Sequence, residues 1–163
     1  SIPSRPFNPR LDYSGEHPNT ISAPETEQDA LMDGGFSSGS ITIGLADVDV
    51  EGDCLNQVYV GLFSDGAATS WKTMGLSRNV LKFNRWGCMV VNLSMVILKP
   101  SQPGDVVKQI SRIIKLRSRT VTMRHDQFNA ETGEPIARSL ATGMLVNLNT
   151  RRAIHFPQHV FSV

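Results

Sequence analysis

The chain has 163 residues, 40% of them hydrophobic, and its 16 Lys and Arg against 15 Asp and Glu give a formal net charge of +1. This size and apolar content predict one domain with a sizeable core of its own. The balanced charge predicts neither nucleic acid nor a membrane as partner, so any basic function must be local. The two cysteines, Cys54 and Cys88, suit reduced thiols in a cytoplasmic protein better than a disulfide framework.

The first part of the chain, residues 1–39, is rich in Pro, Ser, Gly, Asn and acids. It is predicted to be an N-terminal extension, either partly disordered or wrapping the domain, with a short helical turn at 25–32. From Ser40 the chain alternates apolar and polar residues, which predicts a strand over 40–49. The domain is therefore expected to span 40–157, followed by a frayed tail at 158–163.

A helical spacing of apolar residues predicts one long helix over 57–75. Its apolar face is formed by Val58, Leu62, Ala68, Trp71 and Met74. Gly61 and Gly66 are unfavourable inside a helix and weaken this prediction, whereas Gly75 is a suitable C-terminal stop.

Four segments rich in Val, Ile, Leu and Thr follow the helix, at 85–99, 105–117, 119–128 and 134–148. Short polar joints separate them, which predicts an antiparallel meander of consecutive strands. One long helix followed by a curved meander indicates an α+β domain in which the sheet wraps around the helix.

An acidic run precedes the helix and is the most informative stretch of the sequence. Its carboxylates are Asp47, Asp49, Glu51 and Asp53, and Gly52 provides a turn among them. The start of a helix favours negative charge and offers backbone N–H groups that have no partner within the helix. A carboxylate beside such donors is suited to acyl transfer.

The register of five residues in this run resembles the Asp-x-Asp-x-x-Gly segment, with its following Asn and Tyr, of the 4-hydroxybenzoyl-CoA thioesterase-like acyl-CoA thioesterases. These residues are Asp47, Asp49, Gly52, Asn56 and Tyr59. The segments 99–105, 117–121 and 131–137 are similar to later turns and strands of that family, so the resemblance covers about 40–157. Many relatives carry Gly-His and Asn-Asn where this chain has Gly52-Asp53 and Leu55-Asn56.

The resemblance implies a hot-dog fold, a curved antiparallel sheet around one central helix, and hydrolysis of a thioester to a free acid and CoA. It implies that Asp49 acts as general base or nucleophile and that the backbone N–H of Asn56 polarises the carbonyl. Asp65 on the helix is an alternative acid. Residues that would contact the substrate are Gly52, Asp53, Tyr59 and Phe63, although side chains such as Tyr59 and Phe63 belong to the core more often than they line an acyl pocket.

The resemblance implies no metal or redox cofactor, because CoA or an acyl carrier enters as part of the substrate. Arg117 and Arg119 are candidates for a local basic patch that binds the CoA phosphates, or else ordinary outward-facing strand residues. Hot-dog domains pair, so the family implies a homodimer or a dimer of dimers.

Two other functions stay open on the sequence. One is a hot-dog dehydratase or decarboxylase acting on an acyl-CoA-like substrate, although the Asp-x-Asn-Pro-x-x-His-like segment of such hydratases is absent. The other is a non-catalytic acyl-binding or interaction module, which the absence of the usual His and first Asn makes credible.

Overall fold

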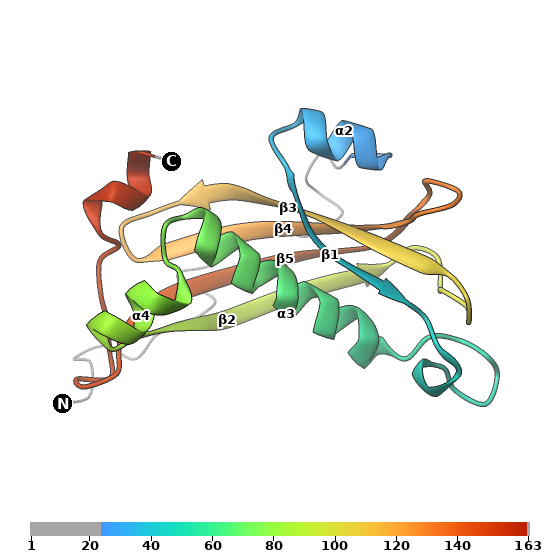
Figure 1. Cartoon of the computed structure of the whole chain (residues 1–163), viewed down its shortest axis with the longest axis horizontal. Helices are drawn as coiled ribbons and strands as arrows, with labels where there is room; N and C mark the ends of the chain where they lie inside the picture. Colours follow the sequence, from blue (N-terminus) through green and yellow to red (C-terminus); the bar gives the residue numbers. More distant parts are fainter. Residues whose placement is uncertain (1–23, 163) are drawn as a thin grey trace.

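The computed structural model describes residues 24–162 and shows a curved antiparallel sheet around one long helix (Figure 1). The helices are α2 (Glu27–Met32), α3 (Asn56–Thr73) and α4 (Arg78–Asn84), with short 3-10 turns η1 (Leu45–Asp47) and η2 (Gln158–Ser162). The strands are β1 (Phe36–Thr42), β2 (Trp86–Ile97), β3 (Val106–Leu116), β4 (Thr120–Asn129), β5 (Pro135–Asn147) and β6 (Arg152–Ala153). The predicted α+β class is confirmed.

The strand order is β1-β3-β4-β5-β2, all neighbours being antiparallel, and β6 pairs with β5. The predicted meander is correct for β3, β4 and β5 but wrong for β2, which pairs with β5 from Trp86↔Asn147 to Ile97↔Ala137. The side of β3 away from β4 pairs with β1, so residues 98–105 carry the chain across to the other part of the sheet. Turn-forming residues in a sequence do not reveal such a crossing.

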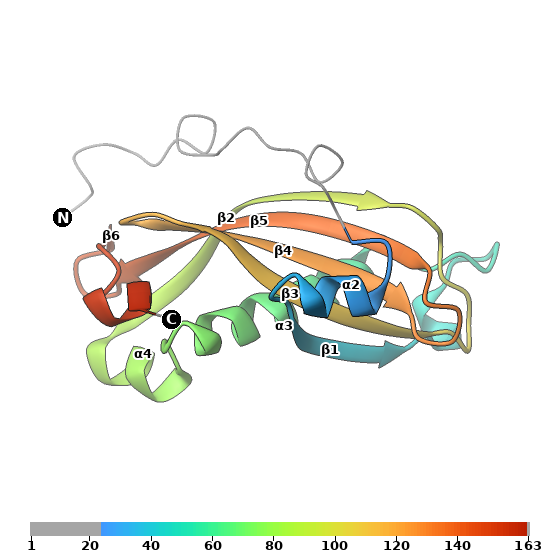
Figure 2. The same cartoon turned by 90° about the horizontal axis from the view of Figure 1, so that it is seen from above.

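Helix α3 lies along the concave face of the sheet (Figure 2). The predicted helix is confirmed, with Leu55 as N-cap and Met74 as C-cap, and Gly75 ends it at a φ of 81°. Ala68, predicted on the apolar face, is exposed, because its neighbour Ala67 is the one that faces the core. The side chains buried on α3 come mainly from Tyr59, Leu62, Phe63, Ala67, Ser70 and Trp71.

The edges of the domain differ from the sequence-based expectation. Strand β1 begins at Phe36 and ends at Thr42, so the strand predicted over 40–49 is wrong beyond Thr42, where η1 and a loop follow. Thr26 caps α2 by accepting the Asp29 N–H at 3.1 Å, and this helix matches the predicted turn at 25–32. At the other end, Val160 in η2 is 1% exposed and packs in the core.

Polar side chains are buried beneath the middle of α3. The Gln109 amide donates to the Leu62 carbonyl at 2.7 Å, and the Gln127 amide donates to the Tyr59 carbonyl at 3.2 Å. A Cβ atom at Gly66 would lie 2.4 Å from the Gln109 Nε2. The glycine that weakened the helix prediction therefore allows α3 to approach a polar part of the sheet.

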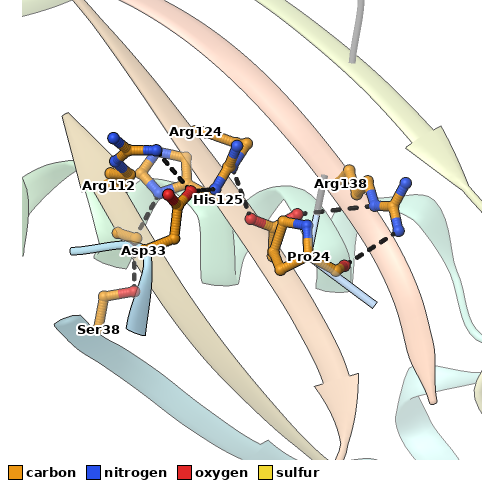
Figure 3. Close-up of polar contacts among 9 residues, drawn as sticks. Pro24, Asp33, Ser38, Arg112, Arg124, His125 and Arg138 are labelled. Atoms are coloured by element: carbon orange, nitrogen blue, oxygen red, sulfur yellow. Dashed lines mark hydrogen bonds and ion pairs between the residues drawn. The ribbon is translucent and has the colours of Figure 1, made fainter. Parts of the chain in front are cut away.

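His125 belongs to the same buried group. Its Nδ1 lies 2.6 Å from the Ser111 hydroxyl, which in turn contacts Ser38 on β1 (Figure 3). The imidazole is fully buried and stacks on the Phe63 ring. Burial lowers the pKa of His125 to about 4, since the charged form would lose its hydration.

The opposite face of the sheet carries a charged network covered in part by α2 (Figures 2 and 3). Asp33, just after α2, forms ion pairs with Arg112 and with Arg124, the second at 3.2 Å. The Arg124 Nε donates to Asp126 at 2.9 Å, and Arg138 lies 3.6 Å from the other oxygen of that carboxylate. Helix α2 is thus held by charges that arise from β3 and β4.

Candidate functional site

The loop between η1 and α3 positions Asp49. Val48 and Cys54 form an isolated antiparallel bridge that closes the loop. Within it, the Asp49 Oδ1 accepts the N–H groups of Glu51 at 2.9 Å and Asp53 at 3.1 Å. The Oδ2 of Asp49 has no hydrogen-bond partner among the described residues, and the side chain is exposed. The carboxylate is therefore oriented through one oxygen and open through the other.

The other acids of the loop have different surroundings. The Asp47 Oδ2 accepts the Gly44 N–H at 2.8 Å, and the Asp47 carbonyl accepts the Leu55 N–H at 2.8 Å, so Asp47 shapes the loop. Glu51 and Asp53 are exposed beside Gly52, whose φ of 88° is the left-handed conformation that favours glycine. Of the four carboxylates, Asp49 combines orientation with access.

The start of α3 follows directly. The N-cap is Leu55, without a side-chain cap, and Asn56 is the first helical residue, with an exposed side chain. Asn56 is therefore not the N-cap, although asparagine commonly occupies that position. The Val58 N–H donates to the Leu55 carbonyl at 3.0 Å, whereas the N–H groups of Asn56 and Gln57 have no acceptor among the described residues and sit at the positive end of the helix. This terminus can stabilise an oxyanion.

Tyr59 and Phe63 form the core beneath the helix start, each with 2% of its surface exposed. The Tyr59 hydroxyl accepts the Ser101 N–H at 2.8 Å, and the Phe63 ring lies 6.1 Å from that of His125. Of the two alternatives that the sequence left for these residues, packing in the core is what this chain displays.

Three predicted residues lie away from Asp49. Asp65 is exposed on α3, nine residues after Asn56, which corresponds to roughly 13 Å along the helix axis. Arg117 and Arg119 are in the turn after β3, at the far end of that 11-residue strand, or roughly 35 Å away. The structure thus gathers Asp49, its loop and the start of α3, and separates both arginines from them.

Ser101 and Cys54 are parts of the site that the sequence did not indicate. The Ser101 carbonyl accepts the Cys54 N–H at 3.2 Å, which ties the loop after β2 to the Asp49 loop. Burial raises the pKa of the Cys54 thiol, so the thiol stays protonated at neutral pH and Cys54 acts as a packing residue of the core. Nothing in its residue type distinguishes Ser101, because only the crossing of residues 98–105 brings it here.

Within residues 24–162, no group of three or more His, Cys, Asp or Glu is arranged to hold a metal ion. The helices of the same range include none that is long and apolar enough to cross a membrane.

A curved antiparallel sheet around one long helix, with a carboxylate oriented in the loop before that helix, defines a hot-dog domain of the thioesterase type. A model of the thioesterase-like superfamily matches residues 43–162, and the chain belongs to this superfamily. The family and fold that the acidic run predicted are confirmed.

Solved structures resemble the chain in fold. A hypothetical protein from Staphylococcus aureus in complex with CoA has a TM-score of 0.72 and 18% identity, covering 87% of this chain and 84% of that one. A 1,4-dihydroxy-2-naphthoyl-CoA thioesterase from Synechocystis has a TM-score of 0.67 and 18% identity, covering 78% and 93%. A DHNA-CoA thioesterase from Staphylococcus aureus has a TM-score of 0.64 and 18% identity, covering 72% and 78%. No curated protein is matched by the sequence.

Proposed function

We propose that this protein hydrolyses an acyl-CoA thioester to a free acid and CoA. The observation that carries the proposal is the Asp49 carboxylate, held by two N–H groups through Oδ1 while Oδ2 is open, directly before the start of α3. Membership of the thioesterase-like superfamily and the similarity to a protein solved with CoA support this substrate class.

In the proposed reaction, the Asp49 Oδ2 takes a proton from water, and the resulting hydroxide adds to the thioester carbonyl carbon. Alternatively, Oδ2 attacks that carbon itself and water hydrolyses the anhydride. In both routes negative charge develops on the carbonyl oxygen, where the N–H of Asn56 contributes roughly 3 kcal/mol by analogy with measured oxyanion holes. The bond to sulfur then breaks, and CoA leaves as a thiolate that needs no strong acid.

A second copy of the chain is part of the proposal. Strand β2 is an edge of the sheet and exposes Met89, Val90 and Leu93, by 49%, 46% and 38%. An apolar edge strand of this length is suited to pairing with another edge. We therefore propose a homodimer formed by antiparallel pairing of two β2 strands.

The distribution of charge supports antiparallel pairing. The end of the domain that carries the Asp49 loop is acidic. Of the 14 Lys and Arg among residues 24–162, nine lie in segments of the opposite end, where these residues include no acid (Figure 1). These basic residues are Lys72, Arg78, Lys82, Arg85, Lys115, Arg117, Arg119, Arg151 and Arg152. Antiparallel pairing places the basic end of one copy beside the acidic end of the other, and thereby cations for the CoA phosphates near Asp49.

Release of free thiol from short, long and aromatic acyl-CoAs tests the proposal, with an acyl-carrier thioester as a further substrate. Asp49→Asn should lower kcat by orders of magnitude, whereas the matched variant Glu51→Gln, at an exposed neighbouring acid, should stay close to wild type. A larger loss in Asp65→Asn would transfer the role of base to the helix. Binding of acyl-CoA without any thiol release would instead identify a non-catalytic acyl-binding module.

A further inference from the structure

We propose that the Tyr59 hydroxyl is a positioning group that sets the Asp49 loop against α3. This inference rests on the proposed function and adds a role to a residue that is buried and has no access to substrate. The Tyr59 side chain is 2% exposed, and its oxygen accepts the Ser101 N–H at 2.8 Å. Ser101 is itself 1% exposed, so the hydrogen bond is shielded from water.

The helix end of this connection is fixed. The Tyr59 carbonyl accepts the Gln127 amide at 3.2 Å, and the Leu62 carbonyl accepts the Gln109 amide at 2.7 Å. Both glutamines are fully buried on the concave face of the sheet, and Gln127 also donates to Gln109 at 3.1 Å. The first two turns of α3 are therefore attached to the sheet at two points, and Tyr59 extends from a rigid position.

The other end leads to the carboxylate. The Ser101 carbonyl accepts the Cys54 N–H at 3.2 Å, and Cys54 bridges to Val48, the residue before Asp49. The Asp49 N–H then donates to the Asp53 carbonyl at 2.9 Å. One phenol oxygen thus connects the helix start, through a loop that is distant in sequence, to the hairpin that orients the base.

This role predicts a selective effect of Tyr59→Phe, which keeps the ring in the core and removes only the hydroxyl. We expect kcat to fall about fivefold, the factor that corresponds to one net hydrogen bond, while KM changes less than twofold. Burial raises the pKa of the Cys54 thiol and a hydrogen bond with the Tyr59 hydroxyl opposes this rise, so loss of the hydroxyl alone would slow alkylation. The loosened loop should instead expose Cys54, so that iodoacetamide modifies it faster than in wild type. Cys88 serves as the internal reference, since burial in β2 raises its pKa to about 12.

The thiol measurement does not depend on turnover, so it separates this inference from the proposed function. Phe128→Leu is the matched control, because it weakens a buried cluster on the other face of the sheet and touches neither loop. Faster alkylation of Cys54 in Tyr59→Phe alone, followed by mass spectrometry, supports the inference. Equal alkylation in wild type and Tyr59→Phe, or equal acceleration in Phe128→Leu, overturns it.

Discussion

The two glycines inside α3 are predicted to change protein stability in opposite directions when each is replaced with alanine. Gly61 is exposed, and a Cβ added there meets no atom within 4 Å. Gly66 is buried, and its added Cβ would lie 2.4 Å from the Gln109 Nε2, 2.8 Å from the His125 Nδ1 and 2.9 Å from the Ser111 hydroxyl. Replacing each glycine with alanine therefore tests whether the polar cluster really fills the space under α3.

The magnitudes follow from two opposing effects. Alanine is favoured over glycine in a helix by about 1 kcal/mol, which is the whole effect expected for Gly61→Ala. At Gly66 the same gain is opposed by overpacking, about 1–3 kcal/mol, and by displacement of buried hydrogen bonds at about 1 kcal/mol each. Gly66→Ala should therefore lower the free energy of unfolding by about 2 kcal/mol.

Thermal unfolding followed by circular dichroism measures both variants. For a chain of this size, 1 kcal/mol corresponds to about 2–4 °C, so Gly61→Ala should raise Tm by that amount and Gly66→Ala should lower it by about 4–8 °C. An increase of Tm in both variants would show that α3 does not approach the sheet as closely as described. Urea unfolding provides the same comparison at a fixed temperature.

Two further predictions concern buried charge. Burial lowers the pKa of His125 to about 4. Below pH 6.5 the unfolded chain therefore binds a proton that the folded chain does not bind. The free energy of unfolding of wild type should fall by up to about 3 kcal/mol between pH 7 and pH 4. The stability difference between wild type and His125→Gln should narrow over this range in urea titrations, and a constant difference would refute a neutral buried imidazole. Asp126→Asn removes the buried carboxylate beside Arg124, which keeps its ion pair with Asp33, and should therefore lower the free energy of unfolding by about 2–3 kcal/mol in the same assay. Glu134→Gln, which breaks the exposed pair with Lys99, should cost at most about 1 kcal/mol, and equal losses would contradict this assignment.

Elements with a strong local pattern were predictable. The helix over 57–75 and the four strands after it follow apolar periodicity and turn chemistry, which depend on neighbours in the chain. The pairing of β2 with β5 was not predictable, because strand partners are chosen by the whole sheet. Helix α4 was missed as well, since Arg78–Asn84 is only seven residues long and packs just two partly buried side chains, Val80 and Leu81, against the core.

The candidate site likewise has features that the sequence predicts and features that it does not. The spacing of Asp49, Gly52 and Asn56 is local, and the structure keeps these residues in one loop and helix start. Residue type alone does not reveal that Asp49 has one bound and one open oxygen, because hydrogen bonds to backbone N–H groups determine this. Nor does it place Arg117 and Arg119 at the opposite end of β3.

The family and the long helix were established correctly from sequence alone, and Asp49 stays a prediction as the base, because each depends on residues close together in the chain. The contact of Tyr59 with Ser101, and the need for glycine at position 66 of a helix, became apparent only from the three-dimensional structure. These features depend on segments far apart in sequence that meet only when the sheet closes around α3.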